Sequence, residues 1–159
     1  MLSVTDYKYN GVALLSNSMM MSGWNSYGAG GTASVVADAN IPGSWRQVTG
    51  NGIGQFVVGE NATTGFNVGD ELLISFRAKC SGGAAGSSTC SAMAAPSYVR
   101  VGKSRYLQGQ YDGIVSGYGV VPSGTTYLAC TSYVQDGTDG KTMSIAQFQI
   151  YNKTAILGR

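Results

Sequence analysis

The clearest alternation of apolar and polar side chains in this chain runs from residue 72 to residue 80. Five apolar residues share one parity: Leu72, Ile74, Phe76, Ala78 and Cys80. The other parity carries the polar residues Ser75, Arg77 and Lys79. Because successive side chains of a strand point to opposite faces, this pattern predicts a strand with one face in the core and one in solvent. Residues 67–70 supply the turn before it.

A second strand is predicted over residues 125–135, after a turn at 122–124. Its apolar face carries Leu128, Cys130 and Val134. Its other face carries Tyr127, Thr131 and Tyr133. This strand repeats the two-faced pattern of the first, with aromatic rings on the face that does not enter the core.

A third strand, over residues 142–154, changes phase in its middle. Met143 and Ile145 are odd-numbered, whereas Phe148 and Ile150 are even-numbered. One inserted residue near 146–147 returns all four to one face, which predicts a β-bulge there. The three strands together predict a buried core, made of Leu72, Ile74, Phe76, Leu128, Cys130, Val134, Phe148 and Ile150.

Glycine contributes 24 of the 159 residues and leaves little room for long helices. Weaker strand candidates, bounded by turn residues, are 11–16, 32–37, 54–59, 97–102 and 114–121. About eight short strands predict an all-β protein, an antiparallel β-sandwich that forms a single domain over residues 1–159. Within it, the Gly-, Ala- and Ser-rich segment 81–97 is predicted to be a long loop, because it has few bulky side chains.

The composition narrows the classes of partner. Only 11% of residues are charged and the net charge is +2. The one basic cluster, Arg100, Lys103 and Arg105, is too small to follow a phosphate backbone, so no nucleic-acid partner is expected. We expect no secretory leader in the first residues, which contain an acid and no long apolar run, and no apolar run is long enough for a membrane span, so no membrane partner is expected.

The three cysteines are an odd number, which favours folding in a reducing cytosol. Cys80 and Cys130 have core parity and are expected to be buried thiols. Cys90 lies in the predicted loop, and its pairing with Cys80 is left open.

The absence of histidine excludes the common nucleophile pairs and histidine metal sites. The eight acidic residues lie mostly in turn contexts, where capping explains them better than a pair of glycosidase carboxylates. We therefore expect no enzyme activity, no catalytic residues, no metal and no cofactor.

Aromatic residues are the largest group of candidates for contacts with a partner, because the chain has 10 tyrosines and 2 tryptophans. Flat aromatic faces on a sheet suit both sugar rings and protein interfaces. The candidate contact residues are Tyr98, Arg100, Tyr127, Tyr133, Trp24 and Trp45. In the alternative interpretation the tyrosines only cover the second face of a sheet, and the two tryptophans belong to the core.

Three stretches resemble the jelly-roll carbohydrate-binding modules. Residues 14–18 followed by Gly23 and Trp24 look like the opening strand and tryptophan of those modules. Residues 68–79 look like their central strand, and 121–127 together with 145–151 look like their last two strands. Similar domains occur on bacteriophage virions, in tail fibres and as capsid decorations. The resemblance implies a jelly-roll fold and either glycan recognition or a place on a virion.

From these features we expect a non-enzymatic virion structural protein, either a capsid decoration or a fibre component. The start at Met1 without a catalytic partner domain favours that role. Its partners would be other virion proteins and copies of itself, with a trimer as the expected homo-oligomer. Contacts would come from residues 1–10, 152–159 and 81–97, and the protein would be made in the host cytoplasm and located on the virion. The alternative is a glycan-binding module that uses exposed Tyr and Trp side chains.

Overall fold

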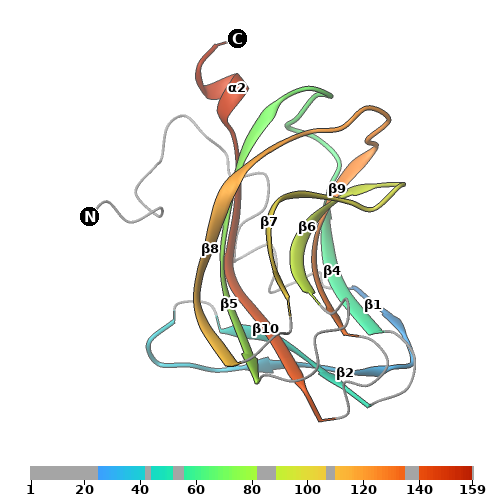
Figure 1. Ribbon diagram of the computed structural model, residues 1–159, viewed down its shortest axis with the longest axis vertical. Helices are drawn as coiled ribbons and strands as arrows, with labels where there is room; N and C mark the ends of the chain where they lie inside the picture. The colour runs from blue at the N-terminus through green and yellow to red at the C-terminus, as the bar shows by residue number, and fades with distance from the viewer. Residues whose placement is uncertain are drawn as a thin grey trace.

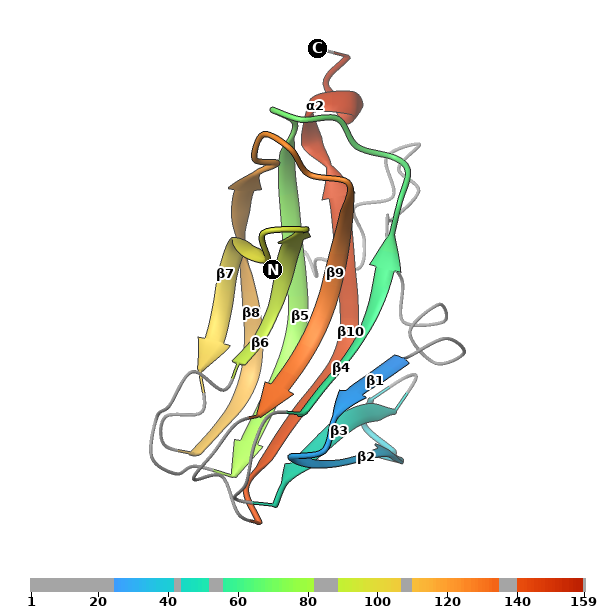
Figure 2. The same cartoon turned by 90° about the vertical axis from the view of Figure 1, so that its right-hand side faces the viewer.

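A computed structural model describes residues 25–41, 44–51, 56–81, 89–106, 110–134 and 140–158. Two five-stranded sheets pack face to face, and a short helix follows near the C-terminus (Figures 1 and 2). All pairings between neighbouring strands are antiparallel. The predicted antiparallel β-sandwich is therefore confirmed, with ten strands in the described residues rather than about eight.

Each sheet combines strands that are distant in sequence. Sheet A has the order β1 (Asn25–Gly28), β4 (Phe56–Ala62), β9 (Tyr127–Val134), β6 (Thr89–Ala95) and β7 (Val99–Tyr106). Sheet B has the order β2 (Gly31–Val36), β3 (Trp45–Gly50), β10 (Thr142–Asn152), β5 (Glu71–Ser81) and β8 (Gln110–Val120). Helix α2 (Lys153–Ile156) continues directly from β10. Within the described ranges, no helix has the length and apolar character that a membrane span needs.

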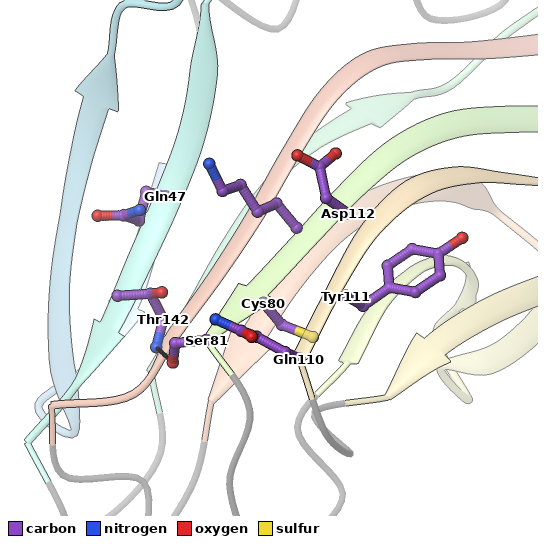
Figure 3. Close-up of a pocket in the computed structure, with 8 residues that line it drawn as sticks. Gln47, Cys80, Ser81, Gln110, Tyr111, Asp112 and Thr142 are labelled. Carbon is purple, nitrogen blue, oxygen red and sulfur yellow. Dashed lines mark hydrogen bonds between the residues drawn. The ribbon is translucent and has the colours of Figure 1, made fainter.

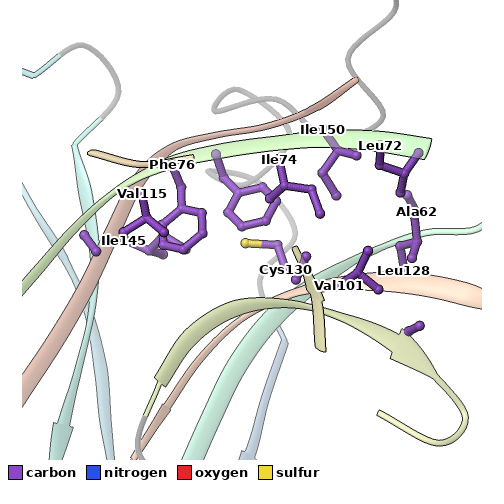
Figure 4. Close-up of a cluster of buried hydrophobic side chains, with 14 of the residues drawn as sticks. Ala62, Leu72, Ile74, Phe76, Val101, Val115, Leu128, Cys130, Ile145 and Ile150 are labelled. Atoms are coloured by element: carbon purple, nitrogen blue, oxygen red, sulfur yellow. The ribbon is translucent and has the colours of Figure 1, made fainter. Parts of the chain in front are cut away.

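The core between the sheets confirms the predicted parities. Seven of the eight predicted residues are at most 2% exposed: Leu72, Ile74, Phe76, Leu128, Cys130, Phe148 and Ile150. The side chain of Val134 lies outside the described residues. Phe76 stacks on Phe148 with ring centroids 5.2 Å apart, and Cys80 is also a buried thiol of this core. Figure 4 shows part of this core, with Phe76, Ile74 and Cys130 among the labelled side chains.

The predicted bulge in the last strand is present. The pairing of β10 with β5 shifts register between Ala146 and Gln149. Gln147 has a φ of 50°, the left-handed conformation that a bulged residue adopts. The shift lets Ile145 and Phe148 face the same core although their numbers differ in parity.

The prediction of a loop over 81–97 is wrong, because residues 89–95 form β6 between β9 and β7. Its inward residues Ala92 and Ala94 are buried in the same core as Ile74 and Phe76 of the facing sheet. A close-packed core needs small side chains opposite large ones, so a strand poor in bulky residues can still be central. Residues 82–88 lie outside the described part of the chain.

Four of the weaker strand candidates match β2, β4, β7 and β8, whereas 11–16 lies outside the described residues. The two predicted turns are also present. Asp70 donates its backbone N–H to the Asn67 carbonyl at 3.1 Å, with Gly69 at a φ of 90°. The Asp70 carboxylate accepts from Asn67 and from Asn152 Nδ2, which ties the start of β5 to the end of β10.

Glycines let the edge strands of the two sheets approach each other. A Cβ atom on Gly119 of β8 would lie 2.3 Å from the backbone nitrogen of Gly102 in β7. No side chain fits at that distance, so the sandwich closes along this side through bare backbone. This close approach is one physical use of the high glycine content.

Candidate functional site

The outer face of sheet A carries three of the predicted aromatic and cationic contact residues. Tyr127 and Tyr133 have the β9 parity opposite to the core residues Leu128 and Cys130. Arg100 of β7 pairs with Met93 of β6 and is exposed. The strands of both sheets bow in the same direction in Figure 1, so the outer face of sheet A is concave. Figure 2 views this face from the front.

Small side chains form the floor between the two tyrosines of β9. Ala129 and Thr131 lie between them on the strand, paired with Met93 and Ser91 of β6. Ser91, Ala95 and Ala129 are buried and Met93 is half-buried, so small side chains and one methionine make up the middle of this face. Since Tyr127 and Tyr133 are six residues apart on one strand, the floor extends for about 20 Å.

Tyr98 joins Tyr127 at one end of this floor. The two hydroxyl oxygens are 2.7 Å apart, and the rings meet edge to face with centroids 6.5 Å apart. Tyr98 lies in the turn between β6 and β7 at a φ of 51°, and its side chain is 54% exposed. The hydrogen bond with Tyr98, together with desolvation, raises the pKa of Tyr127 above its usual value. The pair therefore presents ring surface and hydroxyl groups as one unit.

The turn that holds the pair is fixed by hydrogen bonds between β6 and β9. The Thr126 backbone N–H donates to the Ala95 carbonyl at 2.9 Å. Ala95 in turn pairs with Tyr127 across the two strands. Sequence positions 98 and 127 thus meet only because β6 and β9 are neighbours.

Trp45 does not offer a contact surface, and its prediction as a contact residue is wrong. It lies on the outer face of sheet B, but only 2% of it is exposed, and it packs with Ile41 and Ala146. The indole N–H donates to Asp38 Oδ2 at 3.0 Å, and this bond lowers the pKa of Asp38. The turn at 38–41 covers the ring, as the alternative of a buried tryptophan predicts. Trp24 lies outside the described residues.

The structure has a pocket on the outer face of sheet B that we did not predict from the sequence (Figure 3). It has a volume of about 440 Å³ and is lined by Gln47, Lys79, Cys80, Ser81, Gln110, Tyr111, Asp112 and Thr142. The sequence signal for it was the polar parity of the first predicted strand, which places Lys79 on this face. The other walls come from β3, β8 and β10, and β3 was not predicted. Among the described residues, no three side chains of the usual metal-binding types gather at one point.

Comparisons with known proteins identify the fold. No family model matches the chain, and no curated protein matches it in sequence. The CBM22-1 xylan-binding domain of Paenibacillus barcinonensis Xyn10C superposes with a TM-score of 0.61 at 19% identity, covering 90% of this chain and 96% of that domain. The CBM22-1 and GH10 modules of Clostridium thermocellum xylanase 10B, complexed with xylohexaose, give a TM-score of 0.57 at 14% identity. This match covers 82% of this chain and 26% of that one.

A bacteriophage structure also shares the fold. The enzymatically active domain of the CBA120 tailspike protein 4 gives a TM-score of 0.56 at 14% identity, covering 82% of this chain and 19% of that one. At such identities the likeness establishes the architecture alone. This chain has the jelly-roll β-sandwich fold of carbohydrate-binding modules.

Proposed function

We propose that this protein binds a polysaccharide chain on the outer face of sheet A, without cleaving it. The observation that carries the proposal is the exposed Tyr98–Tyr127 pair at one end of a floor of small side chains, with Tyr133 at the other end. Sugar rings have apolar faces that pack on aromatic rings, and their hydroxyl groups pair with tyrosine hydroxyls and with Arg100. The concave floor leaves room for an extended chain between the aromatic ends.

The fold and the charge distribution support this proposal. The same architecture serves the xylan-binding domain of Paenibacillus barcinonensis. Of the carboxylates whose side chains the structure describes, Asp38, Asp70, Glu71 and Asp112 all belong to the strands of sheet B or to segments next to them, whereas Glu60 lies on β4 of sheet A and its side chain is outside the described residues. A binding face with aromatic rings, hydroxyls and one cation suits a neutral polymer rather than an acid–base reaction.

Affinity electrophoresis through gels that contain soluble polysaccharides tests the proposal. Xylan, β-glucan and galactan should be compared, and at least one should retard the protein. Tyr127→Ala and Tyr133→Ala should each weaken the retarding interaction about tenfold, because each removes a stacking ring. The matched control is Tyr118→Ala, which removes an exposed tyrosine from sheet B and should leave binding unchanged. Retardation by none of the polymers, or an equal loss in Tyr118→Ala, would contradict the proposal.

The virion role predicted from the sequence is a second proposal. Its support is the fold shared with the CBA120 tailspike, together with a surface that is low in charge. The two roles are compatible, because a virion surface protein can present a glycan-binding face to its surroundings. Glycan binding has the stronger support, since several structures with this fold are carbohydrate-binding modules.

A further inference from the structure

The pocket on sheet B is built from two rows of polar side chains that cross the sheet. In the first row Gln47, Ser144, Lys79 and Asp112 lie side by side on β3, β10, β5 and β8. In the second row Thr142, Ser81 and Gln110 lie side by side on β10, β5 and β8. The outward parity of four strands therefore brings donors and acceptors together at one end of the sheet (Figure 3).

Several of these polar groups keep hydrogen-bonding capacity. Gln47 uses Nε2 to donate to Ser144 Oγ at 3.1 Å, and its amide oxygen can still accept. Arg77 Nε and Nη2 each donate to Asp112 Oδ1 at 3.2 Å, so Oδ2 is available as an acceptor. Within the described part of the chain, the Gln110 amide makes no side-chain hydrogen bond. Lys79 adds a donor, and the Thr142 hydroxyl can both donate and accept.

The charges around the pocket balance each other. Arg77 pairs with Asp112, and the positive charge of Lys79 contributes to the lowered pKa of Asp38. The charged residues that line the pocket are one cation, Lys79, and one carboxylate, Asp112, so the lining has no excess charge to attract an ion. Tyr111 also lines the pocket, but its ring packs against the core on the same side of the sheet as Cys80, and its hydroxyl donates to the Ile114 carbonyl at 3.1 Å.

From this geometry we infer a second binding site, which takes a single neutral sugar unit such as a chain end or a side branch. Each sugar hydroxyl is a donor and an acceptor at once, which matches a wall where amides, hydroxyls, an ammonium and a carboxylate oxygen alternate. A volume of about 440 Å³ suits one ring rather than an extended chain. The site lies on the sheet opposite to the tyrosine face, so it is independent of the polysaccharide site proposed above.

Nuclear magnetic resonance titration of the full chain with single methyl glycosides tests this inference. The probes are the methyl glycosides of xylose, glucose and galactose, with methyl glucuronide as the acidic counterpart. At least one neutral glycoside should shift the side-chain amide signals of Gln47 and Gln110 saturably, in the millimolar range expected of so small a ligand. Gln110→Ala should weaken binding about 5-fold, the effect of one lost hydrogen bond, and Thr142→Val should act in the same direction.

Two controls separate this site from the rest of the molecule. Gln149→Ala removes an amide from the outer face of the same sheet, opposite Ser75 and outside the pocket, and should leave the affinity unchanged. Tyr127→Ala should also leave it unchanged, so the sheet A proposal can fail without affecting this one. The inference is overturned if no neutral glycoside shifts these signals or if Gln110→Ala binds as well as the parent. Preference for methyl glucuronide would refute the neutral ligand class.

Discussion

The stacked pair of Phe76 and Phe148 lies at the centre of the core and joins two neighbouring strands of sheet B across the bulge. The rings are nearly parallel, at 10°, and both side chains are fully enclosed. Phe148 can reach this position only because the extra residue near Gln147 rotates the end of β10. One residue of backbone irregularity therefore sets the packing of the largest side chains in the core.

Replacement of Phe76 by Ala should lower the free energy of unfolding by about 3–5 kcal/mol, because it deletes a buried ring and leaves a cavity against Phe148. Urea denaturation followed by circular dichroism measures this loss. Val120→Ala, at a side chain that is 60% exposed, is the control and should change stability by less than about 0.5 kcal/mol. A loss below about 1 kcal/mol for Phe76→Ala would mean that the ring contributes little to the core.

The hydrogen bond between the hydroxyls of Tyr98 and Tyr127 predicts how the stability of the protein depends on pH. The pKa of Tyr127 is raised above the unfolded value near 10, first by the hydrogen bond with Tyr98. Its contribution to stability is therefore present below about pH 10 and is lost as the pH rises through the folded pKa.

Tyr98→Phe should return the pKa of Tyr127 toward its usual value. A pH titration of carbon-13-labelled tyrosine ring signals measures this change, and Tyr118→Phe on sheet B serves as the control. An unchanged Tyr127 titration in Tyr98→Phe would show that the hydroxyl contact does not set its pKa.

At the scale of elements, the decisive feature is the contact between β7 and β8, the edge strands of the two sheets. Gly102 of β7 meets Gly119 of β8 backbone to backbone, and a Cβ atom on Gly102 would lie 3.1 Å from Ile74 Cδ1 in the core. An edge strand normally exposes its unpaired backbone, and here the opposite sheet shields part of it. The glycines thus help to protect one side of the sandwich.

Gly119→Ala should destabilise the protein by about 1–3 kcal/mol, because the new Cβ clashes with the backbone of Gly102. Thermal unfolding measures the loss. Gly117→Ala in the same strand is the control, since its Cβ would meet only the side chain of Lys103, which is exposed and can move aside. Equal melting temperatures for the two variants would show that the β7–β8 contact tolerates a side chain.

At the scale of the whole molecule, the two outer faces point in opposite directions and differ in character. The sheet A face is concave with aromatic ends, whereas the sheet B face carries polar rows and the pocket. Exposed apolar side chains also occur on β8, at Ile114, Tyr118 and Val120. If a glycan binds sheet A as proposed, these exposed side chains of β8 leave a second face for a protein neighbour.

The homo-oligomer expected from the sequence remains a prediction at this scale, with a trimer as its expected form. Sedimentation equilibrium of the full chain should give three times the mass of 16.5 kDa. Ile114→Ser on β8 should weaken the association if this face is buried, whereas Ser116→Ala should not. A monomer at all concentrations would contradict the prediction and leave glycan binding as the sole proposal.

The sequence by itself determined the features that depend on neighbouring residues. The parity of residues 72–80 and of 128–134 specified which side chains enter the core, and the phase change near Ala146 located the bulge. The turns at 67–70 and 122–124 followed from their glycines. These features are local, because the alternation of a strand and the conformation of a turn are set within a few residues.

Only the tertiary structure decided the features that depend on which strands are neighbours. Segment 89–95 became a strand because large side chains of sheet B face its alanines, and Trp45 became buried because the turn at 38–41 covers it. Tyr98 contacts Tyr127, which lies 29 residues later in the sequence. Gln47 of β3 and Asp112 of β8 line one pocket because β10 and β5 lie between these two strands in sheet B. A single sequence contains the side chains of both sites but not the strand order that brings them together, since pairing is fixed by the fit of the whole core.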